Sequence, residues 1–189
     1  AMGSESIDHR LQQADLSDGA VAEAFEMPAA QMEKAAAVLL VGCNIRHELP
    51  LVHQRLLKAS KRGAKIHALG PVDFENAFAL SGKRLVPPSR MLAALNGYAD
   101  GSDKDGSAAV DALRAADGNA VIVLGELAEK HPQAAAIRAA ARALAAATGA
   151  KLNRIPQGAN ALGLARAGVL PSGSGRDANA MMSNPAAGY

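Results

Sequence analysis

The middle of the chain shows two different spacings of apolar residues. Residues 36–42 are almost entirely apolar, as in a strand that helices cover on both faces of a parallel sheet. Apolar residues then recur every three or four positions, at Leu49, Val52, Leu56 and Ala59. Cations fall on the opposite side, at Arg55, Lys58 and Arg62. This spacing predicts an amphipathic helix that begins at Pro50 and ends before Gly63.

A second predicted strand, residues 64–69, completes a unit of about 30 residues, which is the size of a βαβ crossover. Its two strands should be parallel neighbours, because such crossovers are almost always right-handed and return to the same sheet. The plan is repeated by a strand near 119–125, a helix over Pro132–Thr148 stopped by Gly149, and a strand near 151–155. The sequence therefore predicts an α/β fold, Rossmann-like and doubly wound, with a mainly parallel sheet flanked by helices.

Other segments carry weaker patterns. A short helix should begin at Ser17 or Asp18, and another should follow Pro87–Pro88. Turn-forming and charged residues dominate 96–107, which predicts an exposed loop. Cations on the solvent side of the alanine-rich helix are expected to be Arg138 and Arg142.

The same patterns divide the chain into three parts. Residues 1–34 comprise a start, "AMGS", that looks like a cloning remnant, and an N-terminal connecting segment. Residues 35–156 form the α/β domain of two βαβ units. Residues 157–189 are rich in Gly, Ser, Asn and Pro, and we expect a partly mobile, truncated C-terminal segment.

The composition of the chain argues against two classes of function, nucleic-acid binding and membrane insertion. The chain has 189 residues, 49% of them hydrophobic, and a formal net charge of +2. Only 3% are aromatic, so there is little to stack on nucleobases and nucleic-acid binding is not expected. No apolar run approaches the length of about 20 residues that spans a bilayer, so direct membrane insertion is not expected either.

The loop after the first strand, "GCNIRHE", is the first candidate site, because doubly wound sheets bind ligands outside the carboxyl ends of their strands. Gly42 would allow close approach of a ligand, and the amides that follow could receive a phosphate. Neither the G-x-G-x-x-G fingerprint nor a phosphate-loop pattern is present, however. Asn44, Arg46 and Glu48 can equally turn the chain, cap the helix and form a local ion pair, so we predict no cofactor-binding residue here.

Two other loops invite a similar interpretation. Asp73 and Glu75 follow the second strand, where an acid can hold a ribose, but Gly70–Pro71 intervenes and solvated acids are more common there. "QGANALG" contains Gly158, Asn160 and Gly163, yet a helix that starts with Asn160 as its N-cap explains it more simply.

The positions of the histidines and of the single cysteine do not indicate a metal site or a catalytic thiol. The histidines are scattered, at His9, His47, His53, His67 and His131, and none forms an i, i+4 pair. The single cysteine, Cys43, excludes an internal disulfide and a full thiolate set for an iron–sulfur cluster, and a small packed thiol is the expected role. We predict no catalytic residue and no metal site, and a reducing compartment fits this cysteine usage.

Three segments together resemble a known family. They are "IDHRLQQAD" at 7–15, "VLLVGCNIRHELPLVHQRLLKASKRGAKIHALG" at 38–70 and "PQGANALGLARAGVLP" at 156–171. They are similar, in this order, to the molybdopterin-oxidoreductase-like region of the large hydrophilic subunit of respiratory NADH–quinone oxidoreductase, complex I. The shared Asn-x-Arg-x-Glu-x-Pro pattern falls on Asn44, Arg46, Glu48 and Pro50.

The resemblance implies a role that composition could not show. The parent would carry electrons from NADH to quinone through iron–sulfur clusters bound in its missing N-terminal part, with no cofactor in this fragment. Its partners would be other hydrophilic subunits of complex I, and its place the cytoplasmic side of the bacterial inner membrane, as a peripheral protein. The fragment itself would be a non-catalytic scaffold segment.

Two alternatives remain open. Related molybdenum enzymes use an equivalent βαβ unit to hold a pterin dinucleotide, so the chain could be an active molybdopterin-guanine-dinucleotide-binding domain. Those enzymes often have Asp-Pro-Arg after the second strand, whereas this chain has "GPVD" at 70–73, which puts such a grip in doubt. A free-standing nucleotide-binding enzyme is the third interpretation, and it requires a complete core within these residues.

Overall fold

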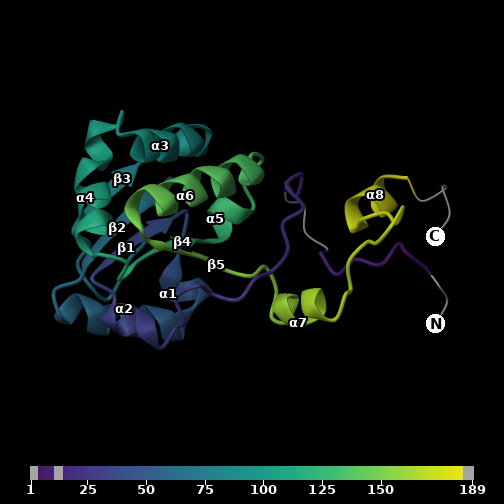
Figure 1. Ribbon diagram of the computed structural model, residues 1–189, viewed down its shortest axis with the longest axis horizontal. Helices are drawn as coiled ribbons and strands as arrows, with labels where there is room; N and C mark the ends of the chain where they lie inside the picture. Colours follow the sequence, from purple (N-terminus) through teal and green to yellow (C-terminus); the bar gives the residue numbers. More distant parts are fainter. Residues whose placement is uncertain (1–3, 11–14, 185–189) are drawn as a thin grey trace.

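A computed structural model describes residues 4–10 and 15–184, and its centre is a five-stranded parallel sheet (Figure 1). The strand order is β3-β2-β1-β4-β5. The strands are β1 (Ala37–Val41), β2 (Lys65–Gly70), β3 (Gly82–Leu85), β4 (Ala120–Leu124) and β5 (Lys151–Arg154). The strand order runs outward from β1 in both directions, so the topology switches between β1 and β4, as in doubly wound nucleotide-binding folds. The predicted fold class is confirmed.

Helices cover both faces of this sheet (Figure 1). The regular helices are α1 (Ile45–Glu48), α2 (Pro50–Lys61), α3 (Pro88–Asp100), α4 (Ser107–Ala115), α5 (Glu126–Glu129), α6 (Ala134–Thr148), α7 (Ala161–Arg166) and α8 (Ala178–Ser183). Short 3-10 turns are η1 (Gln31–Lys34) and η2 (Lys104–Gly106). The face with α3, α4 and α6 holds one core cluster, and the face with α2 holds the other.

The central strands explain why their sequences lack alternation. All five residues of β1 and all five of β4 are buried. Burial on both faces requires apolar side chains at every position, which is what residues 36–42 show. β1 pairs with β2 from Ala37↔Lys65 onward and with β4 from Ala37↔Ala120 onward, all in parallel. The predicted strand neighbours and their direction are therefore confirmed.

Helix ends follow the predicted signals. Pro50 occupies the first turn of α2, where the missing N–H would have no helical partner. Gly63 has φ +94° just beyond α2, and Gly149 has φ +73° just beyond α6. Positive φ is accessible to glycine without steric cost, so both helices stop where the sequence predicts.

Three local predictions are wrong. Ser17 and Asp18 lie in a turn and begin no helix. Residues 96–107 are not an exposed loop, because α3 continues to Asp100 and the Tyr98 side chain is buried. Gly106 makes this burial possible, since a Cβ there would lie 1.8 Å from a ring carbon of Tyr98. Finally, Arg138 is fully buried, whereas Arg142 is exposed as expected.

A segment before η1 lies against the β5 edge. The backbone N–H of Met27 donates to Asn153 Oδ1 at 3.0 Å, and Asn153 Nδ2 donates back to the Met27 carbonyl at 2.8 Å. The N–H of Leu152 donates to a carboxylate oxygen of Glu26 at 2.8 Å. Edge strands expose unpaired backbone groups, and these bonds cover that edge of the sheet.

Candidate functional site

The switch point between β1 and β4 is where a doubly wound sheet would bind a ligand, and here the chain fills it closely. Gly42 has φ +53°, and a Cβ at this position would lie 2.7 Å from the backbone nitrogen of Ala128. A Cβ at Gly125 would lie 2.3 Å from Cα of Cys43. The loops after β1 and β4 therefore pack backbone against backbone, at a separation that only glycine allows.

Glu48 places an internal anion at this point. One carboxylate oxygen accepts a hydrogen bond from the N–H of Asn44 at 2.6 Å, and the other accepts from the N–H of Glu126 at 2.7 Å. Burial raises the pKa of Glu48 above its ordinary value, although the two amide bonds lower it. The amides that open both loops thus already have an acceptor from the chain itself.

The neighbouring motif residues have structural partners. Asn44 stands at the N-cap position of α1 without a capping bond from its side chain. Arg46 forms an ion pair with Glu75 at 3.3 Å rather than with Glu48, which faces the backbone amides. Glu48 therefore caps the start of α1 in place of the Asn44 side chain, because its longer side chain reaches back to the N–H of Asn44.

Cys43 is 7% exposed and lies in the core cluster beneath α2. Burial, with Glu48 adding like charge, raises the pKa of its thiol well above the ordinary range. Because the thiolate is the nucleophile, a thiol held neutral is unreactive. The packed role expected for Cys43 fits this environment.

The two other candidate loops show internal bonding as well. Asp73 pairs with Lys83, and Glu75 pairs with Arg46. Asn160 is at the N-cap position of α7, as expected, but its side chain makes no capping bond and instead lies where a Cβ of Gly163 would be. Of these two loops, the one with Asp73 lines a small pocket of about 20 Å³ together with Gly42 and Cys43, whereas the loop with Asn160 does not line that pocket.

Buried histidines also serve the fold. His53 Nε2 accepts a hydrogen bond from the N–H of Ala77 at 3.2 Å, and its ring lies 5.1 Å from that of Phe78. His131 bonds to the Pro88 carbonyl and to the N–H of Gln133, each at 3.0 Å. Among residues 4–10 and 15–184, no group of three or more His, Cys, Asp or Glu side chains is arranged to hold a metal.

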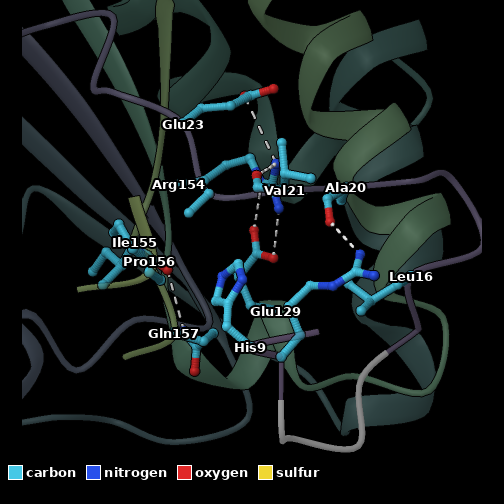
Figure 2. A pocket seen from close by; sticks show the side chains of 13 residues that line it. His9, Leu16, Ala20, Val21, Glu23, Glu129, Arg154, Ile155, Pro156 and Gln157 are labelled. Atoms are coloured by element: carbon cyan, nitrogen blue, oxygen red, sulfur yellow. Dashed lines mark hydrogen bonds and ion pairs between the residues drawn. The ribbon is translucent and has the colours of Figure 1, made fainter. Parts of the chain in front are cut away.

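A pocket that local motifs did not predict lies beyond the carboxyl end of β5 (Figure 2). Its volume is about 80 Å³. Its walls come from the N-terminal segment, α5 and the chain that follows β5, and the labelled side chains include His9, Leu16, Val21, Glu23, Glu129, Arg154 and Gln157. These residues are far apart in sequence and belong to no single motif, so no local pattern signals the pocket.

The charges at this pocket compensate one another. Glu129, 5% exposed, accepts from Arg154 Nε at 2.8 Å and from Arg138 Nη1 at 3.1 Å. Arg138 also binds the Asp18 carboxylate at 2.6 Å, which lowers the pKa of Asp18, and Arg154 reaches the Val21 carbonyl at 3.3 Å. Figure 2 shows Glu129 and Arg154 side by side. Apart from these paired charges, the wall of the pocket is largely apolar. The ion pairs of Arg138 with Asp18 and of Arg154 with Glu23 hold the N-terminal segment against the α/β domain.

Comparisons with known proteins identify the family. The molybdopterin oxidoreductase family model matches residues 1–187. The G-type subunit of NADH-quinone oxidoreductase from Streptomyces coelicolor is 39% identical over 146 residues, which cover 75% of this chain and 17% of that protein. Its counterparts from Mycobacterium bovis and Mycobacterium tuberculosis are each 34% identical over 179 residues, covering 90% of this chain and 21% of theirs. The chain thus spans about a fifth of the length of these relatives.

Among solved structures, a chain of the formyltransferase/hydrolase complex from Methylorubrum extorquens, in complex with methylofuran, has a TM-score of 0.55 and 17% identity. The match covers 90% of this chain and 54% of that one, and at this identity it supports the fold alone. Within the described residues, no helix is long and apolar enough to cross a membrane. From the family match and the curated relatives, the chain belongs to the molybdopterin oxidoreductase family and is a fragment of the type found in the G-type subunit of NADH-quinone oxidoreductase.

Proposed function

We propose that this chain is a non-catalytic scaffold segment of the large hydrophilic subunit of a NADH-quinone oxidoreductase. The parent would carry electrons from NADH to quinone through iron–sulfur clusters bound elsewhere in the subunit. It would lie peripherally on the cytoplasmic side of the inner membrane, among the other hydrophilic subunits.

The observation that carries the proposal is the Glu48 carboxylate across the switch point. A dinucleotide would bring phosphates to the amides after β1 and β4, and those of Asn44 and Glu126 already donate to Glu48. A second anion would meet repulsion from the partly buried Glu48 carboxylate.

The fit of a pterin dinucleotide fails for a second reason. The backbone around Gly42 and Gly125 approaches within distances that exclude even a methyl group, so a phosphate has no room between the two loops. The residues at this edge therefore do not suit the cofactor of the related molybdenum enzymes, and we derive no chemistry through it.

The test uses thermal unfolding of this chain with millimolar GTP or NAD. A working site would raise the free energy of unfolding by about 2.7 kcal/mol at a hundredfold excess of ligand over its dissociation constant. We expect no shift in melting temperature with either nucleotide.

Metal and nucleotide analysis of the purified parent oxidoreductase completes the test. We expect iron in the parent but neither stoichiometric molybdenum nor released guanine nucleotide. One equivalent of either, together with a nucleotide-dependent rise in melting temperature, would favour the molybdopterin-guanine-dinucleotide domain instead.

A further inference from the structure

The outer face of α2 carries an excess of positive charge. Arg55, Lys58 and Arg62 lie within 4.0 Å of one carboxylate, that of Glu33. Other exposed cations on or beside this helix are Lys34, Lys61 and Lys65. Six cations thus lie on or beside α2 and η1, together with one acid, Glu33, and three of the six contact it. The whole chain has a net charge of only +2, so the rest of the chain is net acidic.

The same face presents an exposed apolar side chain. Leu51 is 81% exposed, and it precedes Arg55, Lys58 and Arg62 at spacings of four, three and four residues. Residues at these spacings lie along one side of an α-helix. The opposite side of α2, with Val52, Leu56 and Ala59, is buried in its own core. Leu51 is therefore unused by the fold, and it begins a stripe that ends in three cations.

We propose that this stripe, Leu51, Arg55, Lys58 and Arg62, docks an acidic protein surface with a shallow apolar socket for Leu51. An apolar centre within a polar rim is the usual anatomy of a protein interface, and opposite charge guides its assembly. In Figure 1, α2 covers the face opposite α3, α4 and α6, so its outer side points away from the sheet. The inference rests on the proposed scaffold function, because the partner would be another hydrophilic subunit of the same oxidoreductase.

The other classes of partner suit this face less well. A helix that lies on a membrane needs a broad apolar side toward the lipid, and the apolar side of α2 is already buried. Single-stranded nucleic acid is bound by cations interleaved with aromatic side chains, and α2 contains no Phe, Tyr or Trp. A protein surface needs only complementary carboxylates and one pocket.

The experiment places a photo-cross-linking amino acid at position 51 of the full-length subunit within the purified oxidoreductase. We expect a cross-link to a segment of another subunit that is rich in Asp and Glu. The double substitution Lys58→Glu and Arg62→Glu should lower the cross-link yield at least tenfold, and 0.5 M salt should lower the yield of the wild-type stripe. The matched control is Arg114→Glu with Arg142→Glu, which changes the net charge equally on α4 and α6 and should leave the yield unchanged.

Charge reversal beside Glu33 could disturb α2, so Lys58→Gln with Arg62→Gln is the second variant, and melting curves confirm that each protein is folded. The Lys58→Gln and Arg62→Gln double variant should lower the cross-link yield several-fold. No cross-link from wild-type protein, one to lipid or nucleic acid, or equal yields in all variants would overturn the docking surface. Molybdenum or guanine nucleotide in the parent would instead overturn the proposed function, so the two failures are distinguishable.

Discussion

The carboxylate of Glu48 accepts a hydrogen bond of 2.7 Å from the backbone N–H of Glu126, which lies in the second βαβ unit. This bond joins the loops after β1 and β4 across the switch point. It holds these two loops to each other at the switch point.

Replacing Glu48 by Ala should lower the free energy of unfolding by about 1–3 kcal/mol, because the amides of Asn44 and Glu126 lose their acceptor in a partly buried place. Urea unfolding measures the change. Glu75→Ala is the control, since its ion pair with Arg46 is exposed and should contribute less than about 1 kcal/mol. Equal effects of the two substitutions would show that Glu48 does not bridge the loops in solution.

Arg138→Ala should destabilise the protein by about 3–5 kcal/mol, because it leaves Glu129 with one fewer cation and removes the cation that pairs with Asp18. Because Arg138 no longer holds Asp18, trypsin should cleave the N-terminal segment of the variant, for example after Arg10, faster than that of the wild-type protein. Arg142→Ala, on the exposed side of the same helix, should change stability by less than about 0.5 kcal/mol. A loss of less than about 1 kcal/mol in Arg138→Ala would show that the ion pairs of Arg138 with Asp18 and Glu129 contribute little to the free energy of unfolding.

Stability should fall as pH drops below about 6.5, the ordinary histidine pKa. Burial, with Arg46 nearby, lowers the pKa of His53 in the folded state, and the neutral ring accepts the Ala77 N–H. The unfolded chain then binds a proton that the folded chain does not, so acid favours unfolding. His67, whose pKa is also lowered by burial, acts in the same direction. His53→Gln should reduce the slope of stability against pH between about 5 and 7, and urea unfolding at several pH values measures that slope.

Gly125→Ala should destabilise the fold by at least about 2–3 kcal/mol, because its Cβ would collide with the backbone of Cys43. Gly101→Ala provides the comparison. Its φ is +77° and open space surrounds it, so only the left-handed backbone opposes alanine, at about 1 kcal/mol. Thermal melting of both variants tests this order, and the reverse order would contradict the close packing of the two loops.

The strands and long helices were predictable because their signals are local. An apolar run or a three-and-four spacing records which faces are buried, and Pro50, Gly63 and Gly149 mark helix ends. β3 was not predicted, since its sequence Gly82–Leu85 is half polar and it is an edge strand with partial burial. Tyr98 and the turn around it were missed because the space that Gly106 leaves depends on tertiary packing.

At the candidate site, the sequence indicated the correct loop but not the bonding partners of Glu48 and Arg138. Residues 42–48 do lie at the switch point, yet Glu48 accepts a bond not only from Asn44 in the same loop but also from Glu126, far along the chain. Arg138 appeared solvent-facing because a cation is expected on the exposed side of an amphipathic helix. Its acidic partners are Asp18 and Glu129, and no local pattern connects them.

The paired hydrogen bonds between Met27 and Asn153 set an order for folding during synthesis. β1, α2 and β2 can associate as soon as residue 70 has left the ribosome, because their contacts are close in sequence. β1 must then wait for β4, and the Met27 backbone must wait for Asn153, whose amide satisfies both of its polar groups. Until then, the far edge of β1 is an unpaired apolar strand, which is a surface that chaperones recognise and nascent neighbours can join. The emergence of β4 therefore determines when this edge of β1 stops being a site at which nascent chains can aggregate.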